Sequence, residues 1–89
     1  MRAKNTASQN ARQRISANLK RYRAKLHLSQ EHIAELAGFH RTYISQLERC
    51  TTNISIDGLE RLANALSVDV SALLETAQET ERNLKEKKG

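Results

Sequence analysis

The sequence has no proline and no tryptophan, and only three of its 89 residues are glycine. Proline and glycine interrupt helices more than any other residues, so their scarcity favours an all-α fold. Cys50 is the single cysteine, which excludes an internal disulfide. No apolar run approaches the ~20 residues of a membrane-spanning helix, and no basic-then-apolar signal segment opens the chain. We therefore expect a soluble protein in the cytoplasm.

The residue patterns of catalytic and metal sites are also missing. His27, His32, His40 and Cys50 match no recognised zinc-binding spacing. There is no nucleophile–base motif, no phosphate-cradling glycine loop and no pattern of paired carboxylates. We therefore expect that the protein is not an enzyme and that it uses no metal or cofactor.

Positive charge is concentrated in the first part of the chain. Residues 1–53 hold ten Lys and Arg against three Asp and Glu, a net charge of +7, whereas residues 54–89 hold five against seven, a net charge of −2. This asymmetry is typical of a protein with one phosphate-binding face, although a solvated basic surface without a partner would give the same pattern. A chain of 89 residues builds one small domain, which a dimer interface would help to stabilise.

Apolar residues recur at helical spacing and predict five helices. We expect four of them over residues 11–26, 30–37, 40 or 41 to 48, and 56–66, and a last helix from about residue 69. Ser29 and Ser55 are good N-caps, and Gly58 in the fourth helix costs roughly 1 kcal/mol relative to alanine. The positions expected to be buried include Ala11, Ile15, Leu19, Tyr22, Leu26, Ile33, Leu36, Ile56, Leu59 and Leu62. Residues 1–10 should form a flexible arm, 11–77 the domain, and 78–89 a charged tail or helix extension.

The segment 30–48 contains the most informative pattern. Ala34, Gly38, Ile44 and Leu47 occupy positions 5, 9, 15 and 18 of a unit that starts at residue 30. A small residue lets two helices cross closely, a glycine can take a positive φ between them, and two apolar residues anchor the second helix behind an exposed polar face. The intervals predict a helix-turn-helix and therefore DNA binding.

Longer stretches of the sequence resemble a known family. LSQEHIAELAG, HRTYISQLER and LERLANALSVDVSALL are similar to the phage repressor and Cro-type helix-turn-helix proteins, often called the XRE family, over about residues 11–77. HRTYISQLER followed by TTNISIDGLERLANAL resembles in particular the controller proteins of restriction–modification systems. The resemblance implies a lambda-repressor-like domain that regulates transcription by binding a palindromic operator as a homodimer.

The resemblance also implies which residues contact DNA. In this family the second helix of the unit lies in the major groove, which assigns base reading to Arg41, Thr42, Ser45 and Gln46. Arg can pair with guanine and Gln with adenine, with a phosphate contact as the alternative for Arg41 and plain surface polarity for Thr42 and Ser45. The implied phosphate contacts are Gln30, His40, Tyr43, Arg49, Thr52 and Asn53. The alternatives are an ordinary first-turn residue for Gln30, a helix cap for His40 and a solvated loop for Thr52 and Asn53. For Tyr43 the alternative is packing against the preceding helix.

Further residues are expected to support this site. Arg23 in the first helix should pair with Glu48 and so orient the DNA-facing helix, by resemblance to the family. Cys50 stands where relatives commonly have glycine, and because cysteine tolerates positive φ poorly, we expect the helix to end differently there. A passive thiol is the expected state of Cys50. The dimer candidates are Val70, Leu73, Leu74 and Ala77 of the last helix, with the intramolecular core as their alternative.

Two other functions of the same fold stay open. One is an antitoxin whose main partner is a toxin protein, and the other is a protein-bridging adaptor. RNA polymerase is a further candidate partner of a regulator. An RNA-binding role is weak, because the three aromatic residues offer few stacking surfaces.

Overall fold

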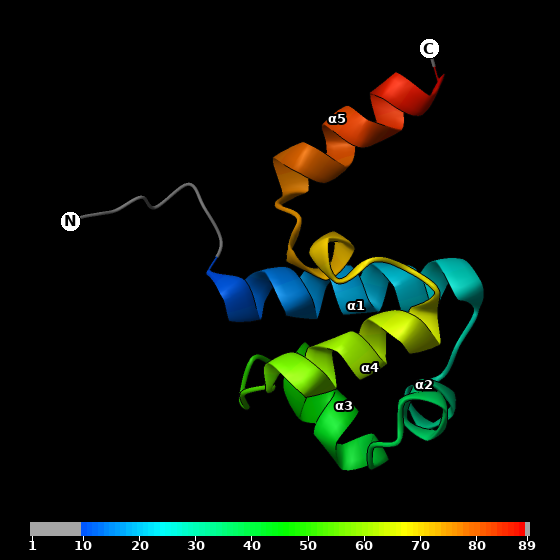
Figure 1. Cartoon of the computed structure of the whole chain (residues 1–89), viewed down its shortest axis with the longest axis vertical. Coiled ribbons are helices and arrows are strands. Elements are labelled where there is room, and N and C mark those ends of the chain that lie inside the picture. Colours follow the sequence, from blue (N-terminus) through cyan, green and yellow to red (C-terminus); the bar gives the residue numbers. More distant parts are fainter. Residues whose placement is uncertain (1–9, 89) are drawn as a thin grey trace, which may run out of the picture.

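The computed structural model describes residues 10–88, with side chains up to Leu84, so nine residues of the expected arm over residues 1–10 lie outside the described residues. The elements are α1 (Ala11–Leu26), α2 (Gln30–Ala37), α3 (Arg41–Glu48), α4 (Ile56–Leu66), the short 3-10 helix η1 (Val70–Leu74) and α5 (Ala77–Lys88). The described residues contain no strand, and the predicted all-α fold is confirmed. Figure 1 shows α1 to α4 and η1 gathered into one body, from which α5 projects away.

The first four helices begin and end where the sequence predicts. Ser29 and Ser55 are N-caps whose hydroxyls accept from the backbone N–H of His32 and Gly58, so both predicted caps are confirmed. Asn10 caps α1 in the same way and completes a capping box with Gln13. These boundaries depend on local side-chain chemistry, which is why the sequence alone indicates them.

Each of the first four helices is followed, directly or one residue later, by a residue in the left-handed conformation. The residues are His27, Gly38, Cys50 and Ser67, with φ of 57°, 78°, 62° and 60°. At α3, the Cys50 N–H donates to the Leu47 oxygen and the Thr51 N–H to the Gln46 oxygen, the pair of bonds that defines a Schellman motif. The expectation that Cys50 would change the end of α3 is therefore wrong. Cysteine here takes the conformation that glycine favours, and these two hydrogen bonds hold it there.

The core lies between α1 to α4 and η1, and Leu19, Ile33, Ile44, Leu62 and Leu73 are fully buried in it. Four residues expected to be buried are exposed instead, namely Ala11, Leu26, Leu36 and Ile56. Each of them lies within the first or last two residues of its helix. There the helix extends past the neighbours that cover its apolar stripe.

The last helix differs from the prediction. The expected single helix from residue 69 is divided into η1 and α5, with Glu75 extended between them. The Asn18 amide, buried in α1, donates to the backbone oxygens of Leu73 and Glu75 and fixes this break. Thr76 and Glu79 then form a reciprocal capping box that starts α5. The sequence carries this capping signal, and the apolar periodicity obscures it.

Candidate nucleic-acid interface

The helix-turn-helix is formed by α2 and α3, which pack against each other through their apolar faces. Ala34 of α2 and Ile44 and Leu47 of α3 are buried in the common core. Gly38, with φ of 78°, ends α2, and the Phe39 N–H donates back to the Ala34 oxygen over 2.8 Å. The turn is therefore closed by backbone hydrogen bonds, and α3 starts at a defined angle to α2.

The polar side of α3 carries the residues that the resemblance assigns to DNA. Arg41 and Thr42 are exposed at its beginning, while Ser45 and Gln46 are half-buried one turn later. His40 is the exposed N-cap and makes no side-chain capping bond, and Arg49 is exposed at the other end. A helix with polar side chains outward and apolar anchors behind them has the form of a major-groove reading helix.

An ion pair anchors the end of α3 to α1. The Arg23 Nε lies 2.6 Å from Glu48 Oε2 and the Arg23 Nη2 lies 3.0 Å from Glu48 Oε1, so the guanidinium meets the carboxylate with two hydrogen bonds. Burial disfavours the charged carboxylate, but hydrogen bonds from Arg23 and Gln30 outweigh this and hold the pKa of Glu48 below its ordinary value. The hydrogen bond to Glu48 raises the pKa of Arg23 in turn. Ser16 adds a third connection by donating to the Glu48 backbone oxygen.

Gln30 connects this ion pair to the exposed face of α3. Its amide nitrogen donates to Glu48 Oε1 over 2.9 Å, and its amide oxygen accepts from Arg41 Nη1 over 3.4 Å. The Gln30 side chain, expected at a phosphate, is thus engaged within the protein in this structure. It places Arg41 at the exposed end of a chain of hydrogen bonds that starts at Arg23.

Arg61 of α4 supports the turn, a role that the sequence pattern does not predict. Its Nε donates to the Ala37 oxygen over 3.1 Å and its Nη2 to the Gly38 oxygen over 2.9 Å, so it caps the carbonyl end of α2. Its guanidinium also lies 4.3 Å from the centre of the Phe39 ring. The partners lie more than twenty residues away in sequence. No local pattern could have indicated them.

The loop 49–55 between α3 and α4 is held at Asn53. The Tyr43 hydroxyl donates to the Asn53 backbone oxygen over 2.6 Å, and Arg12 of α1 donates to the Asn53 side-chain oxygen over 2.8 Å. The Tyr43 ring packs on Phe39, with 4.9 Å between the ring centres. Burial raises the pKa of the Tyr43 hydroxyl, which the charge of Arg61 opposes. The hydroxyl hydrogen of Tyr43 is therefore used within the protein, while Thr52 lies half-buried beside Asn53.

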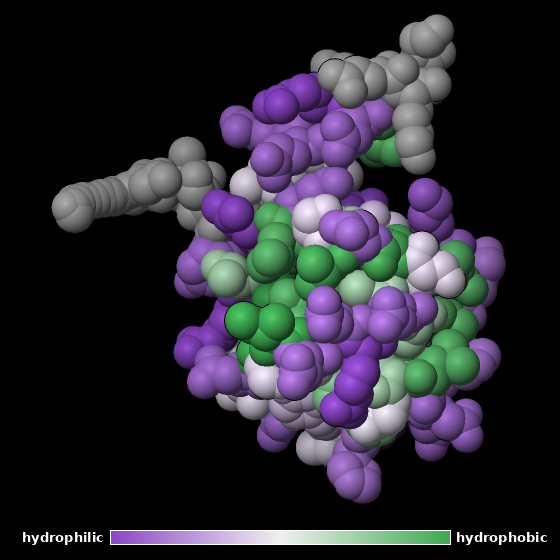
Figure 2. Space-filling view, viewed as in Figure 1, coloured by the Kyte–Doolittle hydropathy of each residue, from purple (hydrophilic) through white to green (hydrophobic). Residues whose placement is uncertain are grey.

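The four dimer candidates differ in how deeply they are buried in the structure. Leu73 is fully buried in the core, the alternative that was open for these positions, so in this conformation it is not available to an interface. Val70 and Leu74 are half-buried, and Ala77 is exposed beyond the break. Figure 2 shows hydrophobic side chains over the face where α4 and η1 lie. Ile56, at the start of α4, is 79% exposed.

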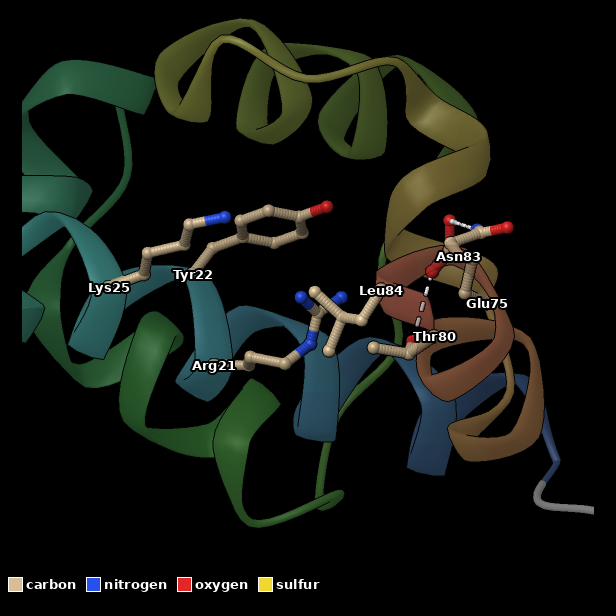
Figure 3. A pocket seen from close by; sticks show the side chains of 7 residues that line it. All are labelled: Arg21, Tyr22, Lys25, Glu75, Thr80, Asn83 and Leu84. Atoms are coloured by element: carbon tan, nitrogen blue, oxygen red, sulfur yellow. Dashed lines mark hydrogen bonds between the residues drawn. The ribbon is translucent and has the colours of Figure 1, made fainter. Parts of the chain in front are cut away.

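A shallow hollow separates α1 from α5. Figure 3 shows Arg21, Tyr22 and Lys25 of α1 on one side and the side chains of α5 on the other. The Glu75 carboxylate accepts from both Thr80 and Asn83.

Within the described residues no three His, Cys, Asp or Glu side chains gather at a point that could hold a metal ion. No helix among them is both long and apolar enough to cross a membrane.

Comparisons with known proteins agree with this geometry. A family model described as helix-turn-helix matches residues 19–73, so the chain belongs to the helix-turn-helix family, and the resemblance is confirmed. Control protein C.SmaI of Serratia marcescens is 40% identical over 75 residues, which cover 84% of this chain and 83% of that protein.

Two solved structures are similar as well. The hypothetical transcription factor NHTF from Neisseria has a TM-score of 0.79 and 35% identity, covering 83% of this chain and 85% of that one. The biofilm regulator SinR, solved in complex with DNA, has a TM-score of 0.64 and 39% identity, covering 68% of this chain and 98% of that one.

Proposed function

We propose that this protein is a transcriptional regulator that binds DNA by placing α3 in the major groove. The observation that carries the proposal is the polar face of α3, which is anchored to α1 by the Arg23–Glu48 ion pair and begins with the exposed Arg41 and Thr42. Membership of the helix-turn-helix family and the likeness to the DNA-bound regulator SinR support it. Affinity should come largely from phosphate neutralisation by the basic part of the chain, and specificity from α3.

Selection of binding sites from random duplexes, followed by footprinting, tests this proposal. We expect a palindromic sequence to be enriched, with half-site centres about 34 Å apart or a multiple of one helical turn apart. Binding should weaken steeply as the salt concentration rises. A chain that enriches no sequence and whose partner binding is insensitive to salt would be an adaptor rather than a regulator.

A homodimer is the form that we propose for DNA binding, because one helix-turn-helix reads only a short half-site. The surface that fits this role is the hydrophobic face over α4 and η1 (Figure 2). In these elements Ile56 of α4 is exposed, and Val70 and Leu74 of η1 are half-buried. Ile56→Glu should shift the protein to a monomer in sedimentation experiments. Leu26→Glu, at an exposed leucine of α1, is the matched control and should leave the mass unchanged. A monomeric wild type would contradict the proposed dimer.

We also propose that the protein controls a restriction–modification system. The support is the identity with a control protein along most of both chains. In that case genes for a restriction enzyme and a methyltransferase should lie beside its own gene, and the selected operator should lie upstream of one of them. A neighbouring toxin gene whose product binds this chain would indicate an antitoxin instead.

A further inference from the structure

We propose that Arg12 and Asn53 form a phosphate-binding site beside α3, in which Arg12 is a DNA-backbone contact that the sequence pattern does not assign. The inference rests on the proposed DNA-binding function. It adds Arg12 of α1 to the DNA interface. It also gives Arg12 the role of orienting the side-chain amide of Asn53.

The hydrogen bonds that hold Asn53 use its two oxygens as acceptors. They leave the N–H donors of its side chain for a ligand. Its backbone oxygen accepts from the Tyr43 hydroxyl over 2.6 Å, and its side-chain oxygen accepts from Arg12 Nε over 2.8 Å. Both oxygens of this exposed residue therefore already accept a hydrogen bond from the protein. The side-chain amide nitrogen carries two further N–H donors. A group that offers donors in a basic region is suited to an anion.

Arg12 can donate to the same anion. Its bond to Asn53 uses Nε, one of five N–H donors of a guanidinium, and the two terminal nitrogens carry the other four. A guanidinium matches the geometry of a phosphate group, with two parallel hydrogen bonds. Among the described side chains no carboxylate pairs with Arg12, whereas Arg23 is already paired with Glu48. The charge of Arg12 is therefore available to a partner.

The position of the pair relative to α3 suits a DNA backbone. The start of α1 lies beside the loop 49–55 (Figure 1). There the Cys50 thiol contacts the Arg12 backbone oxygen at 3.8 Å. This loop directly follows α3, which reads bases in the proposed function. A DNA strand that runs past the end of α3 would therefore meet the terminal nitrogens of Arg12 and the amide of Asn53 together.

The test is the salt dependence of operator binding by the full chain. Arg12→Ala should reduce the slope of log K against log salt by about 0.9 for each protomer on the DNA, because one phosphate contact is lost. At a fixed salt concentration the affinity should fall about tenfold per contact. Base preferences should not change, because phosphate contacts carry no sequence information. Arg82→Ala, an equal loss of charge at an exposed position of α5, is the matched control and should keep the wild-type slope.

Two further variants test the pairing with Asn53. Arg12→Lys keeps the charge, so the salt slope should stay close to that of the wild type, but it loses the planar group that orients the amide. Asn53→Ala should then weaken binding less in the Arg12→Lys background than in the wild type.

Specific outcomes would overturn the site. One is that Arg12→Ala leaves the affinity and the salt slope unchanged. The other is that Arg12→Ala binds less tightly only because it unfolds more easily, with an unchanged salt slope. Both outcomes are distinguishable from a failure of the proposed function, because in each case the wild type still binds its operator. A wild type that binds no duplex overturns this site together with the proposed function.

Discussion

Arg23 and Glu48 are joined by two hydrogen bonds of 2.6 and 3.0 Å, although 25 residues separate them in the sequence. Glu48 is the last residue of α3 and its side chain is only 7% exposed. Any rotation of α3 away from α1 would leave this carboxylate buried without its partner. The ion pair therefore couples the stability of the domain to the orientation of α3, the helix that we propose to face DNA.

Glu48→Ala should lower stability and DNA affinity together. The substitution leaves Arg23 without its carboxylate and Gln30 without the acceptor of its amide. Removing one partner of a buried pair costs about 3–5 kcal/mol, and the 22% exposure of Arg23 reduces this to roughly 2 kcal/mol here. Urea unfolding and operator binding measure the two effects. A loss of affinity with unchanged unfolding would show that Glu48 does not act through the orientation of α3.

Acid should weaken the protein through the same carboxylate. The folded pKa of Glu48 lies below the ordinary value of 4.5, so the folded state binds the proton less readily than the unfolded state. The stability contributed by this group is therefore fully present above pH 4.5 and is lost as the pH falls through the lower folded pKa.

The control for this pH dependence is Glu48→Gln. Hydrogen bonds from Ser71 lower the pKa of Asp69, and a backbone hydrogen bond from Thr76 lowers the pKa of Glu79, so these groups add to acid sensitivity as well. Free energies of unfolding measured from pH 7 to pH 3 should fall less steeply in Glu48→Gln than in the wild type. Parallel curves for the two proteins would assign the acid sensitivity to other groups.

The sequence was most informative where the determining interactions are local. The bounds of α1 to α4 follow from periodicity and from caps such as Ser29 and Ser55, which act within three residues. The contacts of Arg61 with α2 and of Arg12 with Asn53 depend on which helices meet in space, and neither residue differs in its local pattern from an ordinary surface arginine. The division of the last helix also depends on a residue distant in the sequence, because the buried Asn18 that fixes the break belongs to α1.

Cys50→Gly should stabilise the protein. Cys50 has a φ of 62°, a conformation that costs an L-residue about 1–2 kcal/mol and that glycine adopts freely. Glycine also increases the entropy of the unfolded chain, so the net gain should be about 0.5–1 kcal/mol. Arg49→Gly is the control, because Arg49 has a φ of −95° and should gain nothing. Equal or lower stability of Cys50→Gly in urea unfolding would mean that the thiol contact with Arg12 outweighs the backbone strain.

Gly58→Ala should fail to give the stability that helix propensity alone predicts. Alanine is favoured over glycine in a helix by about 1 kcal/mol. A Cβ at Gly58, however, would lie 3.1 Å from both the Ile54 side chain and the capping hydroxyl of Ser55, and 3.4 Å from the Phe39 ring. Asn64→Ala, at an exposed position of the same helix, has no such conflict and should stabilise by a few tenths of a kcal/mol. If Gly58→Ala stabilised more than Asn64→Ala in thermal unfolding, the side chains of Ile54 and Ser55 would have to shift by a few tenths of an ångström at little cost.

Arg41→Ala should cost about 1–3 kcal/mol of operator affinity and relax the preference at one base position. The physical reason is the fork of the guanidinium, which can meet guanine with two hydrogen bonds while Gln30 holds it from the protein side. Arg41→Lys separates charge from shape: it should keep the salt slope of the wild type but lose the base preference. Site selection with each variant measures the preference, and titrations at several salt concentrations measure the slope. If Arg41→Ala bound every sequence more weakly and kept its preferences, Arg41 would be a phosphate contact, and base reading would fall to Thr42, Ser45 and Gln46.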